Sequence, residues 1–191
     1  LLATPVTAVL YERLNWTPKD TAATAWVLVF WGVGLVGHCL VEVLARAFYA
    51  LEDTRTPVLV GGAAMLLNVA FSLTFIRFIG DPGDITRTPA AGLALANSLA
   101  TALEAAGLWG LLRRRLGDFA AEERQIAGSA ARVALASLVM GGLLYAVMRA
   151  LAGWPEVVAL AVAMALGGVV FWAITYALGV AEARAVPGLV L

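Results

Sequence analysis

Residues 21–41 read TAATAWVLVFWGVGLVGHCLV, a run of 21 residues without an Asp, Glu, Lys or Arg. A helix of about 20 apolar residues crosses the hydrocarbon core of a bilayer, which is about 30 Å thick. Such a helix also satisfies its own backbone hydrogen bonds, which lipid cannot do. This stretch is therefore predicted to be a transmembrane helix.

The composition of the whole chain has the same character. Of its 191 residues, 62% are hydrophobic and 14% are charged. Soluble domains average about 45–50% apolar and about 25% charged residues. The mean hydropathy of the chain is +0.89. This composition excludes a disordered segment, and the single cysteine, Cys39, excludes a disulfide scaffold. Thirteen basic residues balance thirteen acidic ones, so no basic surface for nucleic acid is predicted.

Four further stretches are long and apolar enough to cross a membrane, and only Glu104 interrupts one of them near its middle. The predicted fold class is all-α: a polytopic helical membrane protein with five full transmembrane helices plus the end of a sixth. Residues 1–10 are apolar but too short to span, so they are predicted to end a helix whose beginning is missing, and the chain is expected to be a fragment. The predicted spans are about 21–45, 56–79, 88–112, 126–151 and 155–178.

The basic residues are distributed unequally between the two sides of the predicted bundle. The positive-inside rule places the richer side in the cytoplasm, and the C-terminus is then cytoplasmic. The richer side holds Arg46, Arg55, Arg113, Arg114, Arg115, Arg124, Arg132 and Arg184, and the other holds Arg13, Lys19, Arg77, Arg87 and Arg149.

Motifs for soluble chemistry are weak in this chain. Gly32, Gly34 and Gly37 form a G-x-G-x-x-G string, but it lies inside an apolar span rather than after a strand, so it is interpreted as a close-packing surface. His38 and Cys39 are the only residues of their kinds, whereas zinc takes three or four such ligands. No catalytic residue, metal site or cofactor is predicted.

Polar residues inside spans are the candidate functional residues, because lipid makes them costly. His38, Glu42 and Arg46 follow one another at intervals of four, on one helix face. Glu42 precedes Arg46 in the favourable order for an ion pair. Two interpretations stay open for these residues: a pair that reaches the cytoplasmic interface, or the polar wall of a cavity.

A second polar face is predicted in the span over 88–112, from Asn97, Thr101 and Glu104. An isolated carboxylate at this depth must be protonated, paired or hydrated, so Glu104 is expected in a cavity or between helices. Asn68 and Ser72 are expected to join helices by hydrogen bonds. These polar faces favour a transporter with a hydrated cavity. The candidate substrate or cavity residues are Glu104, Asn97, Glu42, His38 and Arg46.

Residues 44–57 read LARAFYALEDTRTP. This segment closely resembles the R-a-F-Y-A-x-x-D-T-[RK]-T-P motif of the bacterial lipid II flippase (MurJ/MviN) family, which belongs to the multidrug/oligosaccharidyl-lipid/polysaccharide exporter superfamily. Flanking likenesses lie at residues 11–13, 17–21, 67–69, 92–98 and 113–117. The residues that match the motif are Arg46, Phe48, Tyr49, Asp53, Thr54, Arg55 and Pro57.

The resemblance implies a place for each part of the chain in a fourteen-helix protein. Residues 1–117 would be the last helices of the second six-helix lobe, and residues 118–191 an additional C-terminal helix pair. In the family that pair forms a groove thought to hold the polyprenyl tail of the substrate. The family's best-known substrate-binding arginines lie in earlier helices and match no residue here.

The implied activity is transport of lipid II from the cytoplasmic to the outer leaflet of the bacterial inner membrane. It would proceed by alternating access, driven by an ion gradient or the membrane potential. The implied partners are lipid II and membrane lipids, with no nucleic acid and no cofactor.

Three alternatives stay open: a related exporter of lipid-linked polysaccharide units or drugs, a non-transporting membrane scaffold, and a membrane enzyme. The segment from Arg46 to Pro57, taken as a loop, also has two interpretations. Arg46 and Arg55 hold anionic head groups or a pyrophosphate, or the segment is a rigid turn. In either case Pro57 suits the first turn of a helix that Asp53 or Thr54 caps.

Overall fold

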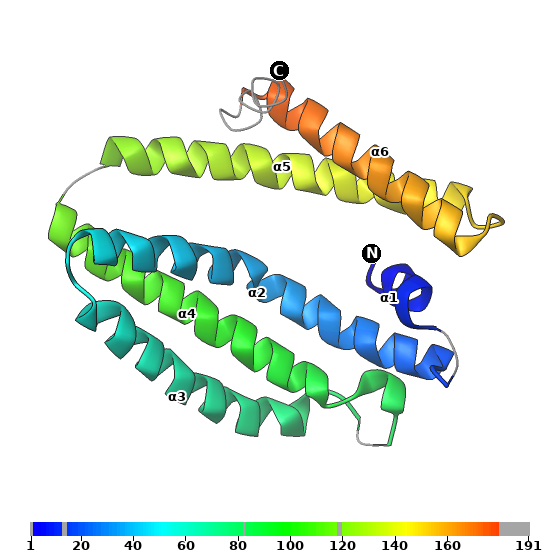
Figure 1. The fold of residues 1–191 in the computed structure, drawn as a ribbon, viewed down its shortest axis with the longest axis horizontal. Coiled ribbons are helices and arrows are strands. Elements are labelled where there is room, and N and C mark those ends of the chain that lie inside the picture. The colour runs from blue at the N-terminus through cyan, green and yellow to red at the C-terminus, as the bar shows by residue number, and fades with distance from the viewer. Residues whose placement is uncertain (1, 13–14, 82, 118–119, 180–191) are drawn as a thin grey trace. The chain divides into compact units, whose positions relative to one another are not determined.

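The structure, a computed structural model, describes residues 2–12, 15–81, 83–117 and 120–179, with side chains from residue 124 onward in the last range. Within these ranges every regular element is helical (Figure 1), so the predicted all-α class is confirmed. The elements are α1 (Ala3–Tyr11), α2 (Pro18–Ala50), α3 (Arg55–Phe78), a 3-10 turn η1 (Ile85–Arg87), α4 (Ala90–Leu116), α5 (Ala120–Ala150) and α6 (Glu156–Ala177).

All five predicted spans fall on helices long and apolar enough to cross a membrane. The bounds of α2 differ most from the expectation, since it runs from Pro18 to Ala50. It starts early because Thr17 and Asp20 form a reciprocal capping box, with Pro18 in the first turn. Arg13 and Arg184, which entered the orientation count, lie outside the described residues.

The late end of α2 corrects the interpretation of the Arg46–Pro57 segment as a loop. Arg46, Phe48 and Tyr49 lie in the last turns of α2, and Pro57 lies in the first turn of α3. Only residues 51–54 connect the two helices. The segment is therefore a tight corner between two helices rather than an extended loop.

The chain divides into two compact units, residues 10–118 and residues 1–9 with 119–191. In the first unit, α4 packs against both α2 and α3, which hardly touch each other, and Figure 1 shows α4 between them. α4 can approach two helices because most of its buried side chains are small. They include Ala91, Gly92, Ala94, Ala96, Ser98, Ala100, Thr101 and Ala105.

The contact between α2 and α4 confirms the packing interpretation of the glycine string at two of its three positions. A Cβ added to Gly34 would lie 2.8 Å from Ser98 Cα, and one added to Gly37 would lie 3.3 Å from the backbone N of Ala102. Nothing lies within 4 Å of a Cβ added to Gly32. Ser98 also joins the two helices directly, since its hydroxyl donates to the Phe30 carbonyl at 2.8 Å.

In the second unit, α5 and α6 pack against each other. Gly167 of α6 admits the Leu144 side chain, which would lie 3.0 Å from an added Cβ, whereas Gly142 and Gly168 have open space. The buried residues of this pair are Ala136, Leu144, Ala159, Leu160, Ala163, Gly167 and Thr175.

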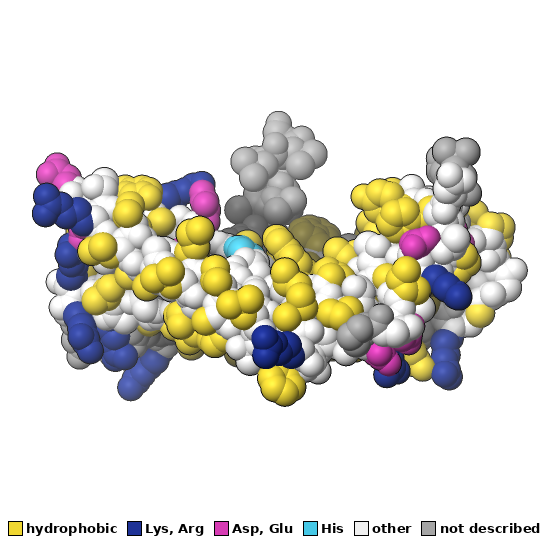
Figure 2. Space-filling view, turned by 90° about the horizontal axis from the view of Figure 1, so that it is seen from below, with side chains coloured by type: hydrophobic (Ala, Val, Ile, Leu, Met, Phe, Trp, Pro, Cys, Tyr) yellow, Lys and Arg dark blue, Asp and Glu magenta, His cyan; other side chains and the backbone are white. Residues whose placement is uncertain are grey.

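The outer surface of the first unit suits a lipid environment. On α3 only Pro57 and Ala64 are buried, and Leu59, Leu66 and Leu73 are largely exposed. Figure 2 shows hydrophobic side chains along the middle of this unit, with Lys and Arg gathered toward the end where α3 begins. Apolar flanks with charged ends are what a membrane-spanning bundle requires.

Candidate functional site

Three helices of the first unit line an open cavity of about 270 Å³. α2 contributes His38, α3 contributes Asn68, and α4 contributes Asn97, Thr101 and Glu104. The remaining lining residues are Val41, Gly61, Ala64, Met65 and Ala100. We call this the polar cavity. Of the five candidate residues from the sequence, His38, Asn97 and Glu104 line it.

Asn97 is the centre of a hydrogen-bond network in the polar cavity. Its Oδ1 accepts from Asn68 Nδ2 at 3.0 Å, and its Nδ2 lies 3.1 Å from His38 Nε2. Asn68 Oδ1 in turn accepts from the Ser72 hydroxyl at 3.1 Å. The expectation that Asn68 and Ser72 join helices is confirmed for Asn68, which bridges α3 to α4. The Trp31 ring stacks on His38 with centroids 5.4 Å apart.

The Glu104 carboxylate lies beside Gly61 in the polar cavity. A Cβ added to Gly61 of α3 would lie 3.2 Å from Glu104 Oε1, so the absent side chain makes room for the carboxylate. Among the described residues, no hydrogen bond or ion pair reaches this carboxylate. A carboxylate within a membrane span that has no protein partner is suited to meet water, a proton or a cationic group.

Glu42 and Arg46 are not brought to the polar cavity. Arg46 Nη2 donates to Glu42 Oε1 at 2.6 Å, and the two side chains are 74% and 67% exposed. The pair therefore lies outside the lining of the polar cavity, and its place at the membrane interface stays a prediction.

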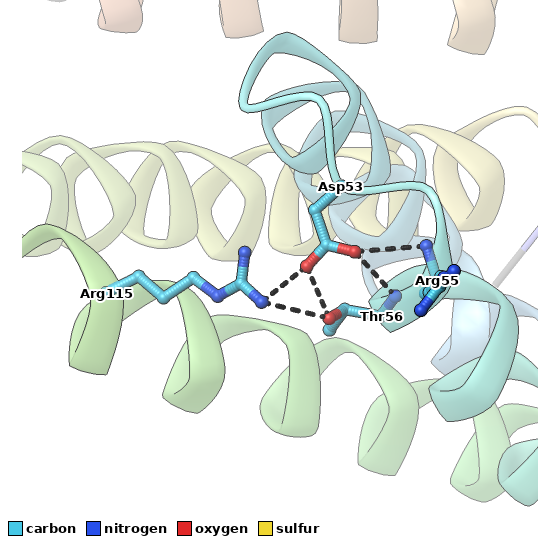
Figure 3. A network of polar contacts seen from close by, with 4 residues as sticks. All are labelled: Asp53, Arg55, Thr56 and Arg115. Atoms are coloured by element: carbon cyan, nitrogen blue, oxygen red, sulfur yellow. Dashed lines mark hydrogen bonds and ion pairs between the residues drawn. The ribbon is translucent and has the colours of Figure 1, made fainter.

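The α2–α3 corner is organised by Asp53 (Figure 3). Its Oδ1 accepts from the backbone N of Arg55 and of Thr56, each at 3.0 Å, and its Oδ2 accepts from the Thr56 hydroxyl at 2.6 Å. These bonds satisfy free amides at the start of α3. Asp53 therefore caps the helix, while Thr54 makes no side-chain cap.

Arg115, at the end of α4, ties this corner to a third helix. Its guanidinium lies 2.5 Å from Asp53 Oδ2 and 5.7 Å from the centre of the Phe48 ring. Phe48 is fully buried and packs with Leu44, Leu108 and Leu112. From the sequence, Arg115 was predicted only to add to the positive charge of one side of the bundle. The pairing could have been suspected, because Asp53 and the basic end of the later span were predicted on the same side of the membrane.

The hydrogen bonds from Thr56, together with the nearby Arg115, hold the pKa of Asp53 below its usual range. The unfolded chain therefore binds this proton more readily than the folded chain, and stability due to Asp53 rises with pH. The contribution of Asp53 to stability is complete above the ordinary aspartate pKa of about 4, and is lost as pH falls through the lowered pKa. We expect Asp53→Asn to lower thermal stability at pH 7 and to matter less and less in acid.

Thermal unfolding of the purified protein in detergent between pH 3 and pH 7 would measure this. The matched control is Glu52→Gln, which removes the charge of the exposed carboxylate one residue earlier. A constant difference between Asp53→Asn and the parent across this range would contradict the assignment.

The family model described as "Lipid II flippase MurJ" matches residues 1–164. The chain belongs to the MurJ family. A probable lipid II flippase MurJ of Vibrio cholerae serotype O1 is 32% identical over 154 residues, which are 81% of this chain and 27% of the relative. A probable lipid II flippase MurJ of Haemophilus influenzae is 30% identical over 157 residues, 82% of this chain and 28% of the relative.

A solved structure agrees at the level of the fold. "Lipid II flippase MurJ, inward closed conformation" superposes with a TM-score of 0.68 at 23% identity, over 91% of this chain and 33% of that one. The chain spans about a quarter of the length of the curated MurJ relatives named above. As a MurJ family member with five candidate membrane spans, it is a multi-pass membrane protein.

In the parts of the molecule that the structure describes, no group of three or more His, Cys, Asp or Glu side chains is placed to hold a metal ion. Cys39 is a free, exposed thiol. The residues of the MurJ family motif lie at a corner where α2, α3 and α4 meet. The polar cavity lies among the same three helices. Ser98 of α4 packs against Gly34 of α2.

Proposed function

We propose that this chain is part of a transporter that moves lipid II from the cytoplasmic to the outer leaflet of the bacterial inner membrane by alternating access. The observation that carries the proposal is the polar cavity, which places an unpaired carboxylate and two amide side chains among three membrane-spanning helices of a MurJ family member. A hydrated polar cavity between helices is where transporters bind and release their substrates and coupling ions.

We further propose that the two parts of the chain have different tasks. Residues 1–117 would be the last helices of the second six-helix lobe, which rocks during transport. Residues 118–191 would be an additional helix pair that accommodates the polyprenyl tail. The boundary between compact units near residue 118 supports this division, whereas residues 1–9 group with residues 119–191. The apolar character of α6, which is long and apolar enough to cross a membrane, also supports it.

The proposed orientation places the α2–α3 corner and the C-terminus in the cytoplasm. Arg55 at the start of α3 and Arg113, Arg114 and Arg115 at the end of α4 lie at one end of the first unit, whereas Arg77 and Arg87 lie at the other. The positive-inside rule supports a cytoplasmic position for the richer end.

The experiment that tests the function uses the complete gene in a bacterium depleted of its own lipid II flippase. We expect survival together with restored exposure of lipid II on the outer leaflet. Membrane expression without rescue would contradict the proposal and favour a related exporter of lipid-linked polysaccharide units or drugs. A non-transporting scaffold would give neither rescue nor a flux that responds to charge changes in the polar cavity.

Charge reversal of both Arg46 and Arg55 to glutamate is expected to impair transport. Both guanidinium groups are exposed at the proposed cytoplasmic end, where they can attract the anionic head group of the substrate or of neighbouring lipids. We expect slower lipid II exposure at equal membrane abundance. Arg77→Glu, at the opposite end of α3, is the matched control. A fully active double variant would make the corner a structural element only.

A further inference from the structure

The hydrogen bonds in the polar cavity form a chain with one direction. Ser72 donates to Asn68, Asn68 donates to Asn97, and the Asn97 amide nitrogen faces His38 Nε2. Each asparagine accepts with its oxygen and donates with its nitrogen, so the direction of one bond fixes the direction of the next. The order starts at Ser72 of α3, passes through Asn97 of α4 and ends at His38 of α2.

This direction fixes the protonation state of His38. Because Asn97 Nδ2 is a donor, His38 Nε2 must accept, and the proton of the neutral ring then sits on Nδ1. A second proton would go to Nε2, which would become a donor facing another donor. Asn97 would have to turn its oxygen toward His38, and its nitrogen would then face Asn68.

The same conflict would pass along the chain to its far end. Asn68 would have to turn as well and present its nitrogen to Ser72. The Ser72 hydroxyl can resolve the conflict, because a hydroxyl both donates and accepts. One proton on His38 thus reverses three hydrogen bonds, two of which join different helices, and the reversed chain contains the same number of bonds as the original one.

We propose that the polar cavity is a proton-binding site, with His38 Nε2 as the acceptor and the Asn97–Asn68–Ser72 chain as a relay that reverses on protonation. Imidazole suits this role because its ordinary pKa lies between pH 5 and 8. The proton comes from hydronium of the surrounding solution, which leaves water behind, and its uptake adds one positive charge between α2, α3 and α4. The site is independent of which lipid the protein carries.

The charged groups around His38 are compatible with an added positive charge. From α4, Glu104 lines the same cavity. On α2, Glu42 lies one turn away but is paired with the exposed Arg46. From α3, no Asp, Glu, Lys or Arg lines the cavity. Glu104 is therefore the acidic side chain available to an imidazolium at this position.

Trp31 provides a direct readout, because its ring stacks on His38 and a protonated imidazole quenches a stacked indole more strongly than a neutral one. The full protein would be titrated between pH 5 and pH 8.5 in lipid nanodiscs. The Trp31 signal is the difference between the fluorescence of the protein and that of its Trp31→Phe variant. We expect quenching in acid with a one-proton midpoint, and no such transition in His38→Gln.

The relay is tested by residues that do not touch His38. Ser72→Ala and Asn68→Leu each remove a bond of the chain, so we expect each to move the midpoint by about half a pH unit or more. Thr74→Val is the matched control on α3, since the Thr74 hydroxyl bonds only the Ala70 carbonyl of its own helix, and its midpoint should not move. A transition that persists in His38→Gln, or a midpoint unchanged in both relay variants, would overturn the proposal.

Discussion

Replacing Gly34 with leucine is expected to separate α2 from α4 and to prevent accumulation of the folded protein. A Cβ at this position would lie 2.5 Å from Ser98 Oγ and 2.8 Å from Ser98 Cα. The Cα belongs to a helix backbone and cannot move away alone. Adding one carbon to a packed contact lowers stability by about 1–3 kcal/mol, and leucine has four more carbons than glycine. The variant also disrupts the bond from Ser98 to the Phe30 carbonyl.

The matched control for this change is Gly32→Leu, on the same helix, where nothing lies within 4 Å of an added Cβ. Both variants would be followed by membrane abundance and by thermal unfolding in detergent. Gly34→Ala gives the milder form of the same effect and keeps the comparison measurable if leucine abolishes expression. Equal stability of the Gly34 and Gly32 variants would contradict the described contact between α2 and α4.

Replacing Glu104 with glutamine is expected to lower lipid II transport by about tenfold or more while leaving abundance unchanged. In the described structure no ion pair or hydrogen bond depends on this carboxylate. Its removal therefore breaks no contact that holds the helices together. An ionisable side chain within a membrane span that makes no such contact is expected to contribute to function rather than to stability.

Exposure of lipid II on the outer leaflet at matched protein abundance would measure this effect. Glu42→Gln is the control, because Glu42 lies in an exposed ion pair outside the cavity lining. Normal transport by Glu104→Gln would show that the carboxylate only serves packing. A loss of abundance equal to the loss of transport would point to a structural role instead.

Several features could be predicted from the sequence because they depend on neighbours along the chain. Each span was visible as an uncharged or nearly uncharged run, since the length of an apolar stretch alone decides whether it can cross a bilayer. A cap by Asp53 or Thr54 was also predictable, because such side chains reach amides two and three residues later, and the structure shows that Asp53 is the capping residue. The bounds of α2 were less predictable, since charged residues such as Glu42 and Arg46 fit a helix that extends beyond the apolar core.

The partners of polar residues were not predictable in the same way. Asn97 lies 29 residues from Asn68 and 59 residues from His38, and Arg115 meets Asp53 across a different pair of helices. Which of these side chains meet depends on the rotation and vertical position of each helix against its neighbour. Small residues such as Gly34 and Ser98 set those positions by permitting close approach, and a single sequence does not say which helix approaches.

Hydropathy and helix length are local properties, so the amino-acid sequence was enough to predict an all-α membrane protein with five spans and polar residues within them. Which polar residues face one another became visible only when the helices were packed. His38, Asn97 and Glu104 share a cavity, while Glu42 and Arg46, on the same helix as His38, lie outside its lining. A helix fixes the directions of its own side chains relative to one another. The packing of α4 between α2 and α3 decides which of those side chains face inward.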